Sequence, residues 1–390
     1  MRLQGRTLVL FDQYRTIGGG QTVLLSVAEA AQQLVDTIVL VIPKGGSLET
    51  AARDRLPGNL KIIGASELRM TSGRKAPLDF LRLAYGTATF VIRYIRLARR
   101  STLLYANGPR QFLGVALLAS IARRPCIYHL HLDHKMVEKR VIGFIAGLRW
   151  TAAVIANSSF TYSRLISALP KLKYNKNVIT IENALSAAYC GGAFENRFVG
   201  HLETWNILVI GVIRPEKGQD LAVALAKQMQ DVRVHIVGAA GAGAERWAAE
   251  LRRKAPDNVT FHEFVDDVQA FIRHHQIHFC LVPSRTDESF GLSAIEAMAC
   301  SCIAVVRDGG GLAEVAARTG AVVFSGGVDE LAIVVHALMN MGNEKLSELA
   351  DMQRRRTLEN YGLSGFVYAI RRVLIAHLDG TNVSEATRHV

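Results

Sequence analysis

The feature of this sequence that most constrains its fold is an alternation of short apolar runs with longer helical stretches, which occurs twice along the chain. The runs are rich in Val, Ile and Leu over their whole length. Strands that are apolar on both faces and separated by helices are typical of parallel sheets covered by helices on both sides. The expected strands are residues 7–11, 37–42, 60–63, 102–106, 126–132 and 152–158, then 206–211, 233–238, 259–264, 278–284, 302–306 and 321–324. The sequence therefore predicts an α/β protein with two doubly wound, Rossmann-like sheets.

The length of 390 residues exceeds what one ordinary core accommodates and suits two domains. We expect an N-terminal domain over 1–185, a small-residue linker over 186–204 and a C-terminal domain over 205–360. A last helix, within 361–380, would pack back on the N-terminal domain. In doubly wound sheets ligands bind beyond the carboxyl ends of the strands, so we expect the two domains to face a central cleft.

Composition and charge limit the compartment and the kinds of partner that the chain suits. The five cysteines are scattered and suit reduced thiols, and no apolar run reaches the roughly 20 residues of a membrane span, so we expect a cytoplasmic protein. Residues 1–200 hold 27 lysines and arginines against 11 acidic residues, whereas residues 201–390 hold 19 against 23. A nucleic acid, an anionic membrane or an anionic substrate would each explain the basic N-terminal half.

The stretch DESFGLSAIEAMA, residues 287–299, carries the strongest chemical signal. It follows an expected strand, and a helix begins near Phe290 or Gly291, where free amides would bind a phosphate. Glu288 and Glu296 return to one side and suit hydrogen bonds from sugar hydroxyls. One diphosphate with a sugar on each side explains both glutamates and the glycine. A helix N-terminus beside a glutamate, or a hydrolase pair of carboxylates, remains an alternative.

Two further loops follow the same logic. GVIRPEKGQD, residues 211–220, follows a strand and carries Lys217, which can neutralise a phosphate. RTIGGGQTVLL, residues 15–25, lies between the first strand and the first helix and would admit a phosphate or sugar against its amides. Ordinary loops with solvated side chains are the alternative in both cases.

Histidines end one strand of the N-terminal half. In HLHLDH, residues 129–134, the period of two puts His129, His131 and Asp133 on one face. A histidine that positions a reacting hydroxyl is favoured over a metal site, because no completing ligand is evident. RHHQIH, residues 273–278, suits a solvated helix end, and we expect no metal site in the chain.

Residues 78–100 have helical periodicity with aromatic and basic side chains. Arg93, Arg96 and Arg100 fall close to one face, a pattern that suits an anionic membrane surface. A core helix whose arginines snorkel to water is an equal alternative.

Together these motifs resemble family 4 of the retaining glycosyltransferases, which have the GT-B fold. The E-x-F-G-L-x-x-x-E-A-M-A signature at residues 288–299 and the following VVRDGGGLAEVA, residues 305–316, carry most of the resemblance, which extends over nearly the whole chain. It implies transfer of a hexose from a nucleoside diphosphate sugar, with UDP or GDP, to a glycan or lipid-linked acceptor in cell-surface polysaccharide or lipopolysaccharide synthesis. We expect no cofactor, and the absence of any Asp-x-Asp pair indicates no metal. The basic helix over 78–100 suits a peripheral place on the inner face of the cell membrane.

The resemblance also assigns roles to residues. Glu288 would contact the donor sugar, Glu296 the ribose and Lys217 the diphosphate, with His131 near the acceptor and donor sugar and His129 as second candidate on the acceptor side. The remaining donor-binding candidates are Gly19, Gly20, Arg214, Phe290, Gly291 and Leu292.

The sequence departs from the family pattern at three places. Val212 stands where the family has an arginine, Ser301 replaces a glycine, and Ile303 replaces a proline. Arg214, two residues after Val212, is the candidate replacement cation. A nucleotide-sugar epimerase of the same fold, or a basic nucleic-acid-binding protein, remains an alternative function; the latter is disfavoured because no reading motif accompanies the basic residues.

Overall fold

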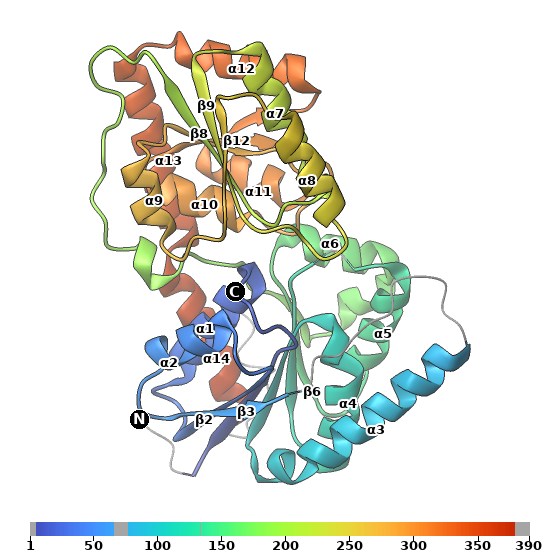
Figure 1. The fold of residues 1–390 in the computed structure, drawn as a ribbon. Helices are drawn as coiled ribbons and strands as arrows, with labels where there is room; N and C mark the ends of the chain where they lie inside the picture. The colour runs from blue at the N-terminus through green and yellow to red at the C-terminus, as the bar shows by residue number, and fades with distance from the viewer. Residues whose placement is uncertain (1–4, 66–76, 133, 379–390) are drawn as a thin grey trace. The chain divides into compact units, whose positions relative to one another are not determined.

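The computed structural model describes residues 5–65, 77–132 and 134–378, with the side chains of 77–84 excepted. The chain forms two compact units, coloured along the sequence in Figure 1. Unit 1 consists of the described residues up to Asn183 together with those from Ser364 onward, and unit 2 of Ala184–Leu363. Each unit has a parallel sheet with helices, as the alternation of apolar runs predicts.

The sheet of unit 1 has, among the described residues, seven parallel strands in the order β3-β2-β1-β4-β5-β6-β7. They are β1 (Thr7–Phe11), β2 (Thr37–Ile42), β3 (Leu60–Gly64), β4 (Leu103–Asn107), β5 (Cys126–Leu130), β6 (Thr151–Ala156) and β7 (Val178–Thr180). The three-residue strand β7 is too short for its pattern to predict it. Because β1, β4 and β5 are neighbours, the residues that follow them meet at one edge of the sheet.

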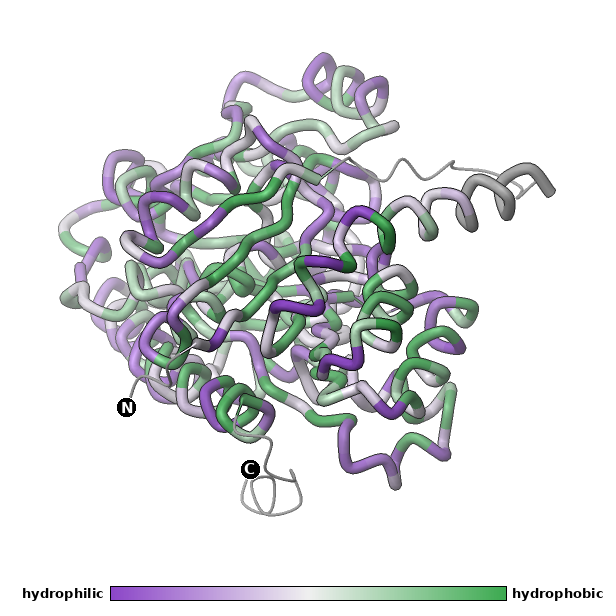
Figure 2. The backbone as a smooth tube through the Cα atoms, turned by 90° about the horizontal axis from the view of Figure 1, so that it is seen from below, coloured by the Kyte–Doolittle hydropathy of each residue, from purple (hydrophilic) through white to green (hydrophobic). Residues whose placement is uncertain are grey.

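Helices cover this sheet. They are α1 (Gly19–Ala31), α2 (Ser47–Arg55), α3 (Pro77–Arg100), α4 (Phe112–Ala122), α5 (Met136–Ala146), α6 (Ser159–Ala168) and α14 (Leu363–Leu378), with 3-10 turns at Pro109–Gln111 and Pro170–Tyr174. The strands appear as hydrophobic stretches in Figure 2, and the helices alternate in hydropathy. Phe11, Phe90 and Tyr94 form an aromatic contact between β1 and α3 in the core. No helix that the structure describes is both long and apolar enough to cross a bilayer.

Helix α14 returns the chain to unit 1 after unit 2 is complete. Figure 1 shows this red helix beside the blue helix α1. The Arg371 guanidinium donates from Nε to Ala30 O at 3.0 Å and from Nη2 to Gln33 Oε1 at 3.0 Å. Phe366, Ile370 and Leu374, spaced at one helical face, are buried. The last helix is therefore part of the core of unit 1.

The sheet of unit 2 has six parallel strands within the described part of the chain, in the order β10-β9-β8-β11-β12-β13. They are β8 (Trp205–Ile210), β9 (Val232–Val237), β10 (Val259–His262), β11 (Phe279–Val282), β12 (Ile303–Arg307) and β13 (Val322–Phe324). Its helices are α7 (Gln219–Gln228), α8 (Glu245–Lys254), α9 (Val268–His274), α10 (Leu292–Ala299), α11 (Gly310–Thr319), α12 (Val328–Met339) and α13 (Asn343–Tyr361), with 3-10 turns at Ala187–Tyr189 and Pro215–Lys217.

The segment 186–204, expected to be a linker, is instead packed into unit 2. Phe198 is 2% exposed and lies in one aromatic cluster with Trp205 and Phe279. Arg197 Nη1 donates to Cys300 O at 2.6 Å, and the Glu195 amide donates to Ser301 Oγ at 3.2 Å. The segment is irregular because its hydrogen bonds go to helix ends and side chains rather than to a ladder, and irregularity is what its composition indicates.

Candidate functional site

The loops that follow β8 and β11 bring a lysine and a glutamate together in unit 2. Lys217 Nζ lies 2.8 Å from Glu288 Oε1, and the Ser284 hydroxyl donates a hydrogen bond to the same oxygen. The Lys217 side chain is 40% exposed and that of Glu288 is 15% exposed. The pair therefore sits at the surface of the loops, where an incoming anion can reach the ammonium group.

A glycine allows the two loops to touch. Gly218 has φ +70°, and a Cβ at this position would stand 2.1 Å from the carbonyl oxygen of Pro283. The Arg285 amide donates to Glu216 O at 2.8 Å, and the Arg285 guanidinium pairs with Asp220. These contacts fix the distance between the loop that carries Lys217 and the loop that carries Glu288.

A third loop, between β12 and α11, contacts the backbone of Glu288. The Gly311 amide donates to Glu288 O at 2.6 Å. A Cβ on Gly310 would stand 2.6 Å from Glu288 O, and a Cβ on Gly311 2.5 Å from Ser289 O. The run DGGGLAEVA thus needs its glycines for backbone-to-backbone contact. We call the loops 211–218, 283–291 and 308–311 the three-loop cluster.

Helix α10 begins inside this cluster. Its N-cap is Gly291, with φ +115°, and the first amides of a helix have no acceptor within the helix. The side chain of Phe290 is buried and packs edge-on against Tyr361, with ring centroids 5.2 Å apart, so only its backbone can face a ligand. Leu292 opens the helix. The helix end therefore offers amides, and a positive dipole end, near Glu288.

Glu296 lies further along α10 and is partly buried. Removal from water raises the pKa of its carboxyl to about 7, so it holds a proton for much of the time at neutral pH. Burial raises the pKa of Cys280 to about 12, and the Glu296 charge adds to this effect. The carboxyl therefore lies in a poorly solvated environment.

Arg214 takes a different direction from the Lys217 side chain. Its Nη2 donates to Ala242 O at 3.4 Å, and its side chain lies so close to Gly241 that a Cβ there would stand 2.7 Å from Arg214 Cδ. Val212 is 50% exposed. The described contacts hold Arg214 on the loop after β9, whereas Lys217 is held on Glu288.

Unit 1 gathers polar groups where β1, β4 and β5 end. His131 Nε2 lies 2.6 Å from Asn107 Oδ1, and Asn107 Nδ2 donates to Asp12 Oδ2 at 2.5 Å and to Gly20 O at 3.1 Å. Gln21 Nε2 donates to Asp12 Oδ2 at 3.1 Å. Because the Asn107 amide group donates to Asp12, its oxygen accepts, and His131 carries its proton on Nε2.

The His131 ring is neutral in this setting. Burial, and secondarily the charge of His134, lowers the pKa of His131 to about 3. Burial also raises the pKa of Asp12 against the hydrogen bonds that it accepts. Gly20, in the first turn of α1, lies beside the ring: a Cβ there would be 3.4 Å from His131, an ordinary van der Waals contact. Gly19 begins the helix. Gly20 and His131, which come from two separate motifs of the sequence, thus lie side by side.

His129 lies in the interior of unit 1. It is fully buried, and the Tyr105 hydroxyl lies 2.6 Å from its Nδ1. Burial raises the pKa of Tyr105 well above its ordinary value, so the hydroxyl is the donor. The rings of His129 and His131 are 4.2 Å apart. His129 therefore supports His131 from below, and Asp133 lies outside the described residues.

Asp12 and Asn107 belong to this site but were not predicted from the sequence. Asp12 directly follows β1, in TLVLFD, and Asn107 is the last residue of β4, in LLYAN; the two strands are neighbours in the sheet. A polar residue at the carboxyl end of each of several adjacent parallel strands is the signal that identifies them.

The exposed face of α3 carries basic and apolar side chains. Arg96 and Arg100 are exposed, and Ile92 is 75% exposed between them and the start of the helix. Arg93 is also exposed, but its Nη2 donates to Gly64 O at 2.9 Å. Phe90 and Tyr94 point into the core. The helix is amphipathic, with Arg93 at the boundary of its exposed face.

Comparison with known proteins agrees with this architecture. Residues 194–356 match the family model of glycosyl transferases group 1. No curated protein sequence matches the chain. Among solved structures, HepE from Anabaena in complex with UDP and glucose is 19% identical, with TM-score 0.79 over 95% of this chain and 100% of that chain. Sucrose-phosphate synthase from Thermosynechococcus elongatus is 16% identical, with TM-score 0.73 over 96% and 100%.

A third solved structure, a glycosyltransferase from Rickettsia africae, is 14% identical, with TM-score 0.68 over the full length of both chains. These likenesses extend over both units, whereas the family match covers unit 2 alone. Residues 194–356 thus match the model of the glycosyl transferases group 1 family, and the chain as a whole has the GT-B fold.

Proposed function

We propose that this protein is a retaining glycosyltransferase that moves a hexose from a nucleoside diphosphate sugar to a glycan or lipid-linked acceptor. The observation that carries the proposal is the convergence of Lys217, Glu288 and the N-terminus of α10 in the three-loop cluster of a group 1 domain. HepE, of the same fold, was solved with UDP and glucose, so UDP is our first candidate and GDP the second.

In the donor complex, Lys217 would leave Glu288 for the diphosphate, because a dianion is a stronger partner for an ammonium than one carboxylate. The amides of Phe290, Gly291 and Leu292 would share the phosphate charge. Glu288, released from the lysine, would accept hydrogen bonds from the sugar, and Glu296 from the ribose. Arg214 would reach the phosphate only after breaking its hydrogen bond to Ala242 O. Lys217 would therefore supply most of the positive charge at the diphosphate, because Val212 carries none.

The transfer itself would use no cofactor and no metal. The bond from the sugar carbon C1 to the phosphate oxygen breaks, and a bond from C1 to the acceptor oxygen forms on the same face of the sugar. The proton of the acceptor hydroxyl passes to the departing phosphate oxygen. The protein contributes positioning and stabilisation of the negative charge on the leaving group.

We assign acceptor binding to unit 1, where the neutral His131 ring would position the acceptor hydroxyl. The basic character of residues 1–200 suits an acceptor that carries phosphate or lies in an anionic membrane. The exposed face of α3, with Ile92, Arg96 and Arg100, supports a peripheral membrane position. A role in cell-surface polysaccharide or lipopolysaccharide synthesis follows from this combination.

A thermal-shift screen of the full chain against UDP, GDP, ADP and their sugars tests the proposal. A nucleotide at 100 times its dissociation constant stabilises the folded state by about 2.7 kcal/mol, which is easily measured. The matching nucleotide sugar is then offered with glycan and lipid-linked acceptors, and the anomeric configuration of the product is determined by NMR.

Each rival function gives its own result. Conversion of the nucleotide sugar without an acceptor would identify an epimerase, and cleavage of glycosides without a nucleotide a hydrolase. Steeply salt-dependent binding to mixed DNA or RNA, with no melting shift from any nucleotide, would identify a nucleic-acid-binding protein. An inverted anomeric configuration would overturn the retaining mechanism but not the transfer.

A further inference from the structure

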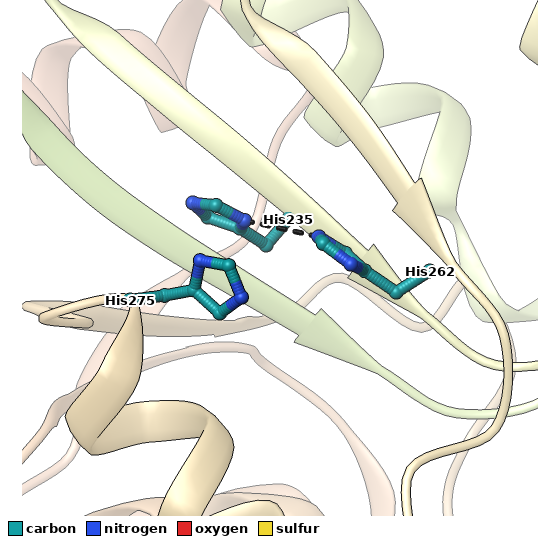
Figure 3. Close-up of side chains that lie close together, drawn as sticks. All are labelled: His235, His262 and His275. Carbon is teal, nitrogen blue, oxygen red and sulfur yellow. Dashed lines mark hydrogen bonds between the residues drawn. The ribbon is translucent and has the colours of Figure 1, made fainter.

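Three histidines of unit 2 meet at the edge of its sheet, and none of them is among the residues assigned to the donor. His235 lies within β9, His262 is the last residue of β10, and His275 follows the last turn of α9. The parallel register pairs His235 with Thr260, so His262, two residues later, points to the same face of the sheet. Figure 3 shows the His275 ring facing the other two from the end of its helix.

The distances suit coordination of one ion. His235 Nδ1 lies 3.1 Å from His262 Nε2, and each of the three rings offers a nitrogen that lies within 4.8 Å of the other two. A tetrahedral zinc ion with bonds of about 2.05 Å needs ligand nitrogens about 3.3 Å apart. One pair is already close to that separation, and small side-chain rotations would bring the third nitrogen to it.

The chemistry of the three rings points to a transition metal. Burial, followed by the neighbouring His275, His262 and Arg233, lowers the pKa of His235 to about 4. Burial likewise lowers the pKa of His262 and of His275. Imidazole coordinates metals in its neutral form, which a lowered pKa favours. Imidazole nitrogens suit Zn²⁺, Cu²⁺ or Ni²⁺, whereas Mg²⁺ and Ca²⁺ prefer oxygen.

An apolar ring closes one side of the cluster. The centroid of Phe271 is 4.8 Å from that of His262 and 4.3 Å from that of His275. His235 is 8% exposed, while His262 and His275 are partly exposed. An ion here would have a shielded side and an open side, which leaves its fourth position to water.

A plain hydrogen bond between two neutral imidazoles is the competing explanation. It accounts for the 3.1 Å contact between His235 and His262, but it needs no third ring. That explanation does not account for His275, which also places a ring nitrogen within 4.8 Å of the other two.

We propose that His235, His262 and His275 form a binding site for a divalent transition-metal ion, with Zn²⁺ as the first candidate. The ion would tie the edge strand β10 and the end of α9 to β9. These three histidines are not among the residues proposed for sugar transfer. The proposal differs from the sequence-based expectations that the chain holds no metal and that residues 273–278 form a solvated helix end.

The test starts with the full chain, stripped of metal by a chelator and dialysed. Isothermal titration with ZnCl₂ is expected to give one site per chain, and Zn²⁺ is expected to raise the melting temperature. Replacement of Zn²⁺ by Co²⁺ should give the absorption bands of a tetrahedral cobalt site with nitrogen ligands.

The variants separate ligation from folding. His275→Ala removes the ring at the end of α9 and should weaken Zn²⁺ binding by more than about 100-fold. Loss of a residue that only orients a metal ligand costs about 10–100-fold, so a larger loss identifies His275 as a ligand. His274→Ala, its exposed neighbour, is the matched control and should bind Zn²⁺ like the unaltered chain. Circular dichroism of the metal-free forms checks that both variants are folded.

His262→Ala provides a second, independent removal of a ligand, and it should also abolish the cobalt bands. Absence of Zn²⁺ binding by the unaltered chain would overturn the proposal in favour of the hydrogen-bonded pair. Equal binding by the His275→Ala and His274→Ala variants would overturn it as well. None of these measurements depends on the sugar-transfer function.

Discussion

Lys217 and Glu288 form an ion pair across two loops, with Nζ 2.8 Å from Oε1, although both are proposed to serve a donor that would separate them. The pair holds the two charged groups in position and is partly exposed, so its own contribution to stability is at most about 1 kcal/mol. The lysine is thus positioned for binding rather than for folding.

Lys217→Ala should therefore lower kcat/KM for transfer by about 10²–10³-fold, the usual loss for one electrostatic contact to a charged transition state. Its melting temperature should change little. Lys227→Ala, an exposed lysine near the end of α7, is the control and should keep full activity. A fall of less than about tenfold in Lys217→Ala would argue against its contact with the diphosphate.

Glu296 predicts a pH dependence of stability. Because its pKa in the folded chain is about 7 instead of 4.5, the folded state binds more protons than the unfolded state between these pH values. Stability therefore falls as pH rises toward 7, by at most about 3 kcal/mol. Glu296→Gln should remove this part of the slope and melt above the unaltered chain at pH 8.

Urea unfolding at pH 5 and pH 8 measures that slope. Glu348→Gln, at an exposed position in α13, is the control and should leave it unchanged. The proposed ribose contact adds a second readout, weaker nucleotide binding by Glu296→Gln at pH 8. If the unaltered chain and Glu296→Gln show the same pH slope, the carboxyl does not titrate near 7.

Asn107 should fix the tautomer of His131. Its oxygen accepts the Nε2 proton, so nitrogen NMR of the unaltered chain should report protonated Nε2 in a ring that stays neutral down to pH 5. Asn107→Ala should lose this preference and reduce kcat by about 10²-fold through misplacement of the ring. A His131 spectrum that does not respond to Asn107→Ala would remove Asn107 from the site.

The exposed face of α3 should bind anionic vesicles. Each arginine near such a surface contributes about 1 kcal/mol, so Arg96→Glu with Arg100→Glu should weaken cosedimentation with phosphatidylglycerol vesicles by at least about 30-fold. The control variant is Arg253→Glu with Lys254→Glu, which reverses the charges of two exposed residues of α8 in unit 2. Equal binding of the two double variants would refute a membrane contact through α3.

Much of the fold follows from local pattern. Runs such as TIVLVI are apolar on both faces because their sheet is covered on both sides, and helix 78–100 ends at Arg100 as its periodicity predicts. The prediction of a GT-B fold is confirmed, and residues 194–356 match the family model of glycosyl transferases group 1.

Long-range contacts decide what local pattern does not show. Nothing near Arg214 in sequence indicates that it lies on Gly241, and nothing near Phe198 indicates its burial beside Trp205. The histidine cluster is hidden for the same reason, since His235, His262 and His275 come from three separate elements. Such groups become visible only after strand order is known.

Helix α14 has a consequence for how the protein is made. A ribosome delivers unit 1 up to Asn183 first, then all of unit 2, and only then helix α14, whose Arg371 bonds to Ala30 and Gln33. The surface of unit 1 that α14 covers with Phe366, Ile370 and Leu374 therefore stays exposed while the second half of the chain emerges and folds. Unit 2 can therefore be finished before unit 1, although its synthesis starts later.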